Sequence, residues 1–277
     1  MVLQVLVRRV WFDALDEVRF PDAKAANVLR GGFGQSLRAT ATPAIYEQIF
    51  EPKQEGPGPS GLADPPRPFL FRAKHLDGQR IAKHDDFSFD VHVFGLTEVA
   101  DTITIALEHL FEKGAGVGRG KARLTAVADE RIDLPILATE TASHIKVTFL
   151  TPTELKHQGR VISQPEFPVL IRRVRDRVST LMSLYGSGEP AMDFHLFGKT
   201  ADEVRMLRAD VDVQDVARTS TRTGQTHTIG GMVGDAEYVG KLDAFLPFLR
   251  AAQYTGVGRH TVWGNGCIQT EILGAQR

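Results

Sequence analysis

The chain has 277 residues, of which 42% are hydrophobic and 24% charged, and its formal net charge at pH 7 is -1. These proportions are typical of a folded globular protein and exclude a disordered chain, and the length suits one large domain or two small ones. Because the net charge is close to zero, any contact with nucleic acid must come from a local basic face and not from the field of the whole molecule.

No apolar run approaches the roughly 20 residues that a membrane-spanning helix needs. Arg8 and Arg9 also interrupt the first apolar segment before a signal-peptide core could form. The single cysteine, Cys267, excludes an internal disulfide and a cysteine-rich zinc site, and no two histidines have the spacing of a helical metal site. We therefore expect a cytoplasmic protein with no membrane contact, no metal and no cofactor.

Hydrophobic periodicity in the first half of the chain predicts six regular elements. Alternating apolar and polar residues indicate half-buried strands, and apolar residues three or four positions apart indicate amphipathic helices. In chain order we expect a strand at 2–12, a helix at 23–38, strands at 68–73 and 87–94, a helix ending near 113 and a strand at 121–127. The stretch 51–67 is rich in proline and glycine, so we interpret it as an exposed loop inside the first domain.

The second half predicts the same order of elements. We expect a strand at 145–150, a helix at 168–184, strands at 204–217 and 226–233, a helix at 238–254 and a strand at 266–273. The third of these strands is expected to end at Gly234, as its counterpart in the first half ends at Gly95.

A repeated phrase indicates that one architecture is duplicated. Gly116-Val-Gly-Arg119 recurs 140 residues later as Gly256-Val-Gly-Arg259, each time between an expected helix and an expected strand. The order strand, helix, strand, strand, helix, strand is that of ferredoxin-like domains, in which two helices cover one face of a four-stranded antiparallel sheet. We therefore predict an α+β fold of two tandem ferredoxin-like, RRM-like βαββαβ domains, at 1–136 and 137–277.

The two glycine-rich loops are candidate binding elements. A dinucleotide fingerprint needs a strand before the glycines and a helix after them, the reverse of the order expected here. A phosphate-loop NTPase is disfavoured because Ala122 follows Gly120-Lys121 where magnesium needs a hydroxyl. Glycines still let backbone amides approach a polyanion, although a tight turn with positive φ would also select them. The candidate nucleic-acid contacts in these loops are Gly116, Gly118, Arg119, Lys121, Gly256, Gly258, Arg259, His260, Trp263, Gly264 and Gly266.

Further basic residues lie outside the glycine loops. The helix at 168–184 carries four arginines within six positions, which form either a nucleic-acid contact or a solvated face. They are Arg172, Arg173, Arg175 and Arg177. Arg218 and Arg222 stand at the expected tip of the hairpin between the second and third strands of the second half, which either contacts phosphates and 2′-hydroxyls or is a solvated turn. Trp263 can stack on a base or pin its loop to the core.

Six phrases lie in order along nearly the whole chain. They are Leu29-Arg-Gly-Gly-Phe-Gly-Gln-Ser-Leu-Arg38, Tyr46-Glu-Gln-Ile-Phe-Glu-Pro52, Pro66-Arg-Pro68, the loop from Gly114 to Arg123, Phe149-Leu-Thr-Pro152 and Gly256-Val-Gly-Arg-His-Thr-Val-Trp-Gly-Asn-Gly266. This ordered set resembles the RAMP (repeat-associated) proteins of CRISPR systems, specifically their repeat-processing endoribonucleases. The resemblance implies a basic cleft between two ferredoxin-like domains, binding of a CRISPR repeat RNA, often as a short hairpin, and metal-independent cutting in which a ribose 2′-hydroxyl attacks the adjacent phosphate.

The chemistry that the resemblance implies needs a base, an acid and cations at one phosphate. Many family members carry a histidine on or just after the first helix, but residues 22–50 contain none. Tyr46, as a proton donor or orienting group, and Arg38, as a cation, are the catalytic candidates there. His260 is the alternative base or acid, with a phosphate contact or a plain surface position as the competing interpretation. Lys24 and Arg30 are expected to bind RNA.

We therefore predict an endoribonuclease that processes CRISPR precursor RNA, with repeat RNA and other CRISPR effector subunits as partners and either a monomer or a homodimer as its assembly. The missing first-helix histidine favours the alternative, a non-catalytic RAMP scaffold that binds guide RNA in an effector complex. A tandem RRM-like binder unconnected with CRISPR fits less well, because neither half has the aromatic strand signature expected for base stacking.

Overall fold

The computed structural model describes residues 2–53, 65–137, 140–219 and 226–274, but not the side chains of 215–229. The first half contains β1 (Val2–Ala14), β2 (Val18–Arg19), α1 (Ala25–Thr40), α2 (Pro43–Phe50), β3 (Phe69–Arg72), β4 (Arg80–Ile81), β5 (Asp86–Phe94), α3 (Ala100–Lys113) and β6 (Ala122–Pro135). The second half contains β7 (His144–Thr153), β8 (Lys156–His157), β9 (Arg160–Val161), α4 (Phe167–Tyr185), α5 (Phe194–Asp202), β10 (Arg205–Thr219), β11 (Thr226–Val239), α6 (Leu246–Thr255) and β12 (Ile268–Gly274).

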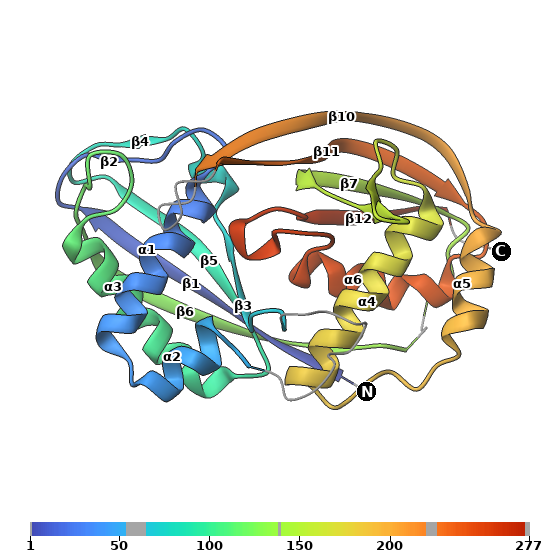
Figure 1. The fold of residues 1–277 in the computed structure, drawn as a ribbon, viewed down its shortest axis with the longest axis horizontal. Coiled ribbons are helices and arrows are strands. Elements are labelled where there is room, and N and C mark those ends of the chain that lie inside the picture. The colour runs from blue at the N-terminus through green and yellow to red at the C-terminus, as the bar shows by residue number, and fades with distance from the viewer. Residues whose placement is uncertain (1, 54–64, 138–139, 220–225, 275–277) are drawn as a thin grey trace.

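Each half is built on a four-stranded antiparallel sheet with helices against one face (Figure 1). The strand orders are β3-β5-β1-β6 and β10-β11-β7-β12. Each half contributes four strands to its sheet. Counted along the chain among these four, the second strand lies at one edge of the sheet, followed by the third, the first and the fourth. This is the ferredoxin-like arrangement, so the predicted fold of two tandem ferredoxin-like domains is confirmed.

Strand β1 separates two hydrophobic cores. Its side chains alternate in direction, so Leu6, Val10 and Phe12 are buried under α1 and α3. Leu3 and Val5 point to the opposite, inner face and join the core of the second half. The second half therefore covers part of the inner face of the first sheet, and the two halves bury a shared apolar surface.

Two arginines and a histidine hold the C-terminal end of α6 from both halves. Arg72 Nη2, His92 Nδ1 and Arg177 Nε donate to the last three carbonyl oxygens of this helix, at 2.7, 2.9 and 2.8 Å. Cationic donors are favoured there because the last carbonyl groups form the negative end of the helix dipole. Burial lowers the pKa of Arg177 to about 10, and the charge of Arg72 adds to the effect. The end of α6 is thus fixed between β3, β5 and α4.

The end of the third strand in the second half differs from the prediction. β11 continues past Gly234 to Val239, and α6 begins only at Leu246, so the helix expected from 238 is wrong in its first part. At Gly234 the register with β7 shifts, and its φ of 121° lets the chain pass close to the carbonyl oxygen of Asp210. The glycine therefore marks an irregularity within the strand and not its end.

Three further features were not expected from periodicity. α2 and α5 are short helices whose N-terminal amides are capped by Thr42 and Asp193. β6 continues through the acidic stretch 128–135, which pairs with the beginning of β1. We propose the domain division at 136/137, between β6 and β7. Of the helices that the structure describes, none combines the length and the apolar character that a bilayer crossing needs.

Candidate nucleic-acid interface

The second glycine loop, residues 256–266, connects α6 to β12. Its four glycines, Gly256, Gly258, Gly264 and Gly266, all have φ between 69° and 89°, a region that residues with a Cβ rarely adopt. The loop closes on itself through a hydrogen bond from the amide of Val257 to the carbonyl oxygen of Gly266, at 2.9 Å. Glycine is therefore required here by the backbone, as one of the two interpretations of the sequence expected.

A nearly buried carboxylate holds the basic side chains of this loop. Glu154 Oε1 accepts from Arg259 Nη1 at 2.8 Å, and Glu154 Oε2 lies 3.8 Å from His260 Nε2. The ring of His260 stacks on the indole of Trp263, with ring centroids 4.5 Å apart. The imidazole is thus oriented on two sides, and only 17% of its side chain is exposed. Arg259, expected to contact phosphate, is engaged by Glu154 although 53% of its side chain is exposed.

The close packing of Gly258 can be tested against a matched glycine. A Cβ at Gly258 (φ 77°) would overlap the carbonyl oxygen of Glu154, whereas a Cβ at Gly159 (φ 80°) would meet nothing within 4 Å. Gly159→Ala is expected to lower the free energy of unfolding by about 1 kcal/mol through backbone strain alone. Gly258→Ala should lose about 2 kcal/mol, because the overlap adds to the strain. Urea unfolding of both variants measures the difference, and equal losses would show that the loop is not packed tightly on Glu154.

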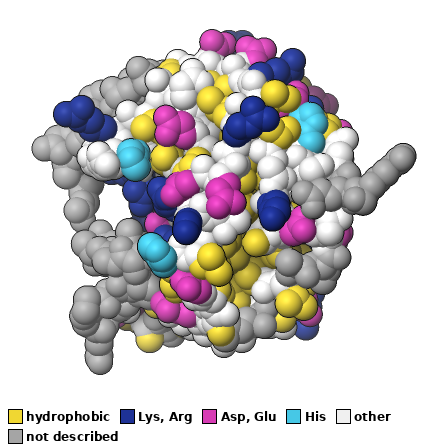
Figure 2. Space-filling model, turned by 90° about the vertical axis from the view of Figure 1, so that its right-hand side faces the viewer, with side chains coloured by type: hydrophobic (Ala, Val, Ile, Leu, Met, Phe, Trp, Pro, Cys, Tyr) yellow, Lys and Arg dark blue, Asp and Glu magenta, His cyan; other side chains and the backbone are white. Residues whose placement is uncertain are grey.

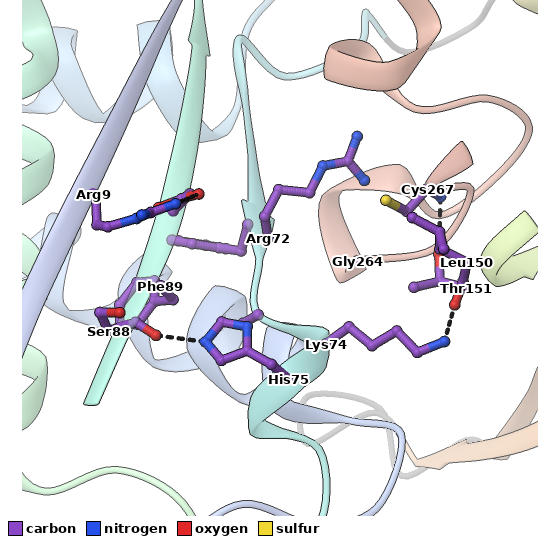
Figure 3. Close-up of a pocket in the computed structure, with 13 residues that line it drawn as sticks. Arg9, Arg72, Lys74, His75, Ser88, Phe89, Leu150, Thr151, Gly264 and Cys267 are labelled. Atoms are coloured by element: carbon purple, nitrogen blue, oxygen red, sulfur yellow. Dashed lines mark hydrogen bonds and ion pairs between the residues drawn. The ribbon is translucent and has the colours of Figure 1, made fainter. Parts of the chain in front are cut away.

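A cavity of about 680 Å³ opens beside this loop, between the inner face of the first sheet and the start of β12 (Figure 3). We call it the interdomain pocket. Its residues from the first half are Arg9, Phe71, Arg72, Ala73, Lys74, His75, Ser88, Phe89 and Asp90, and those from the second half are Leu150, Thr151, Gly264 and Cys267. Three cations face a single carboxylate in this set, so the pocket has an excess of positive charge, which suits a polyanion.

Hydrogen bonds fix most of the polar side chains of the pocket. Arg9 forms a bidentate pair with Asp90, at 2.6 and 2.9 Å. His75 Nε2 donates to the carbonyl oxygen of Ser88 at 2.7 Å, and Lys74 Nζ donates to that of Leu150 in the second half (Figure 3). These contacts give the pocket a rigid wall.

Arg72 differs from these residues, because one of its side-chain nitrogens makes no hydrogen bond to a described residue. Its guanidinium points toward Cys267 (Figure 3), and its Nη1 is buried without a hydrogen-bond partner among the described residues. Burial lowers the pKa of Arg72, opposed by the neighbouring groups of Cys267 and Asp90. A buried donor without an acceptor is costly unless a ligand or water completes it, so Arg72 is a ready donor to an anionic ligand.

The first glycine loop lies elsewhere. Its Val117 amide donates to the carbonyl oxygen of Arg19 at 2.8 Å, and a Cβ at Gly116 would overlap the same oxygen, so the loop packs on β2. Gly118 lies against the Arg19 side chain. Arg119 and Lys121 are exposed. None of these residues lines the interdomain pocket, so contact of this loop with RNA stays a prediction.

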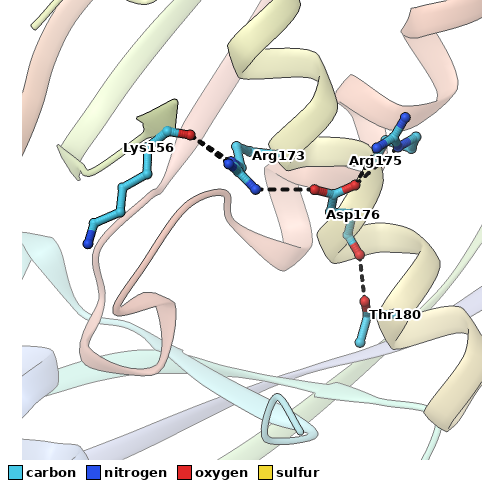
Figure 4. A network of polar contacts seen from close by, with 5 residues as sticks. All are labelled: Lys156, Arg173, Arg175, Asp176 and Thr180. Atoms are coloured by element: carbon cyan, nitrogen blue, oxygen red, sulfur yellow. Dashed lines mark hydrogen bonds and ion pairs between the residues drawn. The ribbon is translucent and has the colours of Figure 1, made fainter. Parts of the chain in front are cut away.

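The four arginines of α4 are engaged by protein groups and do not form an open basic face. The guanidinium of Arg177 points into the interior, where its Nε donates to the carbonyl oxygen of Thr255, and it does not line the interdomain pocket. Arg173 donates to the carbonyl oxygen of Lys156, and Arg175 pairs with Asp176 (Figure 4). Arg172 pairs with Asp202 at 2.6 Å. On the side of the molecule that carries α5, the described cationic and anionic side chains are interspersed (Figure 2).

The predicted catalytic residues fall into two places. Tyr46 and Arg38 line a separate cavity of about 320 Å³ between the end of α1 and α2, where Tyr46 donates to Glu51 at 3.2 Å. Burial, with the charge of Glu51, raises the pKa of Tyr46. The loop of His260 instead contacts the start of α1, since a Cβ at Gly264 would lie 2.6 Å from Ala26. Arg38 follows Ala26 by twelve positions on the helix, which is about 18 Å along the axis.

The remaining predicted contacts are placed as follows. Arg30 lies over the ring of Phe50 at 4.7 Å and that of Trp263 at 5.9 Å, so it joins α2 to the second glycine loop. Lys24 is the N-cap residue of α1. Arg218 belongs to β10, but its side chain is among those that are not described, and Arg222 lies outside the described residues.

The cations of the pocket and Glu154 were not predicted from the sequence. One signal was present, because Ser88, Asp90 and His92 alternate with buried apolar residues of β5. That alternation marks a polar strand face, but it does not reveal that another domain lies against this face.

Comparison with known proteins agrees with this architecture. A family model described as CRISPR-associated endoribonuclease Cas6 matches residues 147–268, and a second model, described as an N-terminal domain, matches residues 3–149. No curated protein matches the chain.

Several solved structures share the fold over the full length. A Cas6 product complex aligns over 98% of this chain and 100% of its own, with a TM-score of 0.62 and 18% identity. Cas6 of Thermus thermophilus aligns over 97% and 98%, with a TM-score of 0.60 and 12% identity. A RAMP protein described as binding different RNA substrates aligns over 96% and 99%, with a TM-score of 0.54 and 13% identity. The match of residues 147–268 to the Cas6 endoribonuclease model, together with the tandem fold shared with the solved Cas6 structures, supports a CRISPR repeat-processing protein of the RAMP type.

Proposed function

We propose that this chain binds CRISPR repeat RNA and cuts it at one position in each repeat, without using a metal ion. The match of residues 147–268 to the Cas6 endoribonuclease model supports the class of reaction. The observation that carries the proposal is the second glycine loop, which presents an imidazole oriented by a carboxylate and also lines a pocket with excess positive charge.

The reaction has defined requirements for protons and charge. The ribose 2′-oxygen attacks the adjacent phosphorus and the bond from phosphorus to O5′ breaks, so that one product ends in a 2′,3′-cyclic phosphate and the other in a 5′-hydroxyl. The 2′-hydroxyl proton leaves to a base, and the departing O5′ receives a proton from an acid. His260 performs one of these transfers, with Glu154 orienting its ring. Arg72 and Lys74 neutralise phosphates in the interdomain pocket.

Other predicted contacts keep roles around this centre. The amides of the second glycine loop approach the RNA backbone, and Arg30 lies over the ring of Trp263 in that loop. Lys24 adds a cation at the start of α1. Tyr46 and Arg38 lie at the far end of the same helix, so in this proposal they contact a more distant part of the RNA.

One observation favours the alternative of a non-catalytic scaffold that binds guide RNA. The acid-base candidates are split between the two ends of α1, so the described geometry brings only His260 to the loop. A scaffold would retain repeat RNA without cutting it.

Cleavage in the presence of a chelator separates the two functions. Purified protein incubated with repeat RNA in excess EDTA is expected to give one cut per repeat and a product with a 2′,3′-cyclic phosphate, identified by mass spectrometry. A repeat substituted throughout with 2′-deoxyribose is the control, because it lacks the attacking group and should stay intact. Retention of uncut ribose RNA would support the scaffold, and a cut that needs added Mg²⁺ would contradict the metal-free chemistry.

A further inference from the structure

Trp11 is a large aromatic residue without a place in either hydrophobic core. It points to the inner face of the first sheet, on the same side of β1 as Leu3 and Val5. Those two residues are covered by the second half, whereas Trp11 lies further along the strand, is partly exposed and packs in neither core cluster. Its position is therefore not explained by the stability of the fold.

The residues beside Trp11 on the sheet are small, and its side chain is partly exposed. Across the sheet it is flanked by Ser88 on β5 and Ala126 on β6, both too small to cover an indole. Between the rungs of Trp11 and Phe12 the register with β6 shifts, which makes Thr125 an extra residue in that strand. Such bulges are over-represented beside functional sites, where they re-aim side chains. Here the bulge lies directly beside the partly exposed indole.

A cavity of about 360 Å³ adjoins the indole. It is lined by Trp11, Asp86 and the four consecutive β6 residues 125–128. The guanidinium of Arg9 lies 6.0 Å from the centre of the indole and also lines the interdomain pocket. Arg9 and Trp11, which lie on the same side of β1, thus line two neighbouring cavities.

Exposed cations lie on both sides of the indole along the sheet. Arg9 precedes Trp11 by two residues, and Arg123 pairs with Asp13 two residues beyond it. Arg9 is paired with Asp90 as Arg123 is with Asp13, and the side chains of Arg9 and Arg123 are nevertheless 53% and 67% exposed. An aromatic ring between two cations suits a base whose neighbouring phosphates reach the cations, the arrangement by which single strands are bound.

We propose that Trp11 stacks on an unpaired base of the bound RNA, next to the phosphates that the interdomain pocket holds. The inference rests on the proposed function and specifies it, because only a single-stranded part of the repeat can offer a base face to a sheet. Asp86 can accept a hydrogen bond from an amino group of that base.

Tryptophan fluorescence tests the contact directly. The chain has two tryptophans, Trp11 and Trp263, so Trp263→Phe leaves Trp11 as the only indole. A single-stranded oligonucleotide of the repeat sequence is expected to quench this signal as it binds, with binding followed independently by the anisotropy of a label on the RNA. A blunt hairpin without unpaired ends is expected to leave the signal unchanged. Binding of the single strand without any change at Trp11 overturns the inference.

A pair of substitutions gives the second measurement. Trp11→Ala is expected to weaken binding of the single-stranded oligonucleotide about tenfold, the effect of losing one base stack. Trp11→Phe should keep most of the affinity because it keeps a ring. The slope of affinity against salt should not change in Trp11→Ala, since no charge is lost, but should fall by about one contact in Arg123→Gln.

The outcomes separate this inference from the proposed function. Undiminished affinity in Trp11→Ala, or an equal loss in Trp11→Phe, overturns the stacking contact while RNA binding and cutting by the wild type still support the function. Absence of any repeat RNA binding or cutting by the wild type overturns the function, and the inference with it.

Discussion

His260→Asn is expected to lower the single-turnover rate of repeat RNA cleavage about a hundredfold to ten-thousandfold, with little change in repeat RNA affinity. This is the range for losing one acid-base group, because proton transfer must then go through water. Asparagine is the informative replacement, since His260 has a φ of 64° and asparagine tolerates this left-handed backbone. Single-turnover conditions report the chemical step without product release.

His84→Asn is the matched control for this prediction. His84 also has a positive φ, 73°, and lies outside both the second glycine loop and the interdomain pocket. The control variant should cut at the wild-type rate. A decrease of less than threefold in the single-turnover cleavage rate of His260→Asn would show that this imidazole takes no part in the reaction. Such a result would favour Tyr46 as the acid-base group, or the scaffold function.

The sheets were predictable from the sequence because their strands carry a strong alternation. In β1 the buried Leu6, Val10 and Phe12 alternate with residues of the inner face. A period of two residues can be recognised in the sequence without knowledge of the tertiary structure. The helices α2 and α5 were not, because eight or nine residues give too few turns for a periodic signal. Their caps, Thr42 and Asp193, were the available local signals.

The repeated glycine phrase predicted the geometry of two turns but not their surroundings. Gly118 and Gly258 both have positive φ, so the same residues satisfy the same backbone in each half. Their neighbours differ, because the first loop packs on Arg19 and the second on Glu154. Only the second loop lines the interdomain pocket. A phrase that repeats therefore identifies a turn, and the tertiary environment decides whether the turn meets a ligand.

The charged part of the site depends on partners that are distant in sequence. In the sequence Arg177 is one of four arginines on a helix face, but in the structure it donates a hydrogen bond to a carbonyl oxygen 78 residues away. In the sequence Arg72 and Asp90 are polar residues of two predicted strands. They line the pocket only because the second half covers the adjacent part of the sheet. Such pairings follow from domain packing, which sequence periodicity does not encode.

His92 makes the free energy of unfolding depend on pH between about pH 4 and pH 6.5. Burial, with the charge of Arg72, lowers the pKa of His92 to about 4 from an ordinary value of 6.5. The folded protein therefore keeps a neutral imidazole where the unfolded chain already binds a proton. The stabilisation is complete above pH 6.5 and is lost as the pH falls toward 4, below which it stays constant. Between pH 7 and pH 4 the loss amounts to about 3 kcal/mol.

Comparison with His92→Gln isolates this contribution from the acidic residues that titrate in the same range. Glutamine can donate to the carbonyl oxygen of Tyr254, as His92 Nδ1 does at 2.9 Å, but it binds no proton in either state. The free energy of unfolding, measured with urea at several pH values, should therefore fall more steeply with decreasing pH in the wild type than in the variant. Between pH 7 and pH 4 the wild type should lose about 3 kcal/mol more than the variant. NMR titration of the His92 ring gives the midpoint directly. Parallel unfolding curves, or a midpoint near 6.5, would mean that the ring is hydrated and that the two halves do not close over the end of α6.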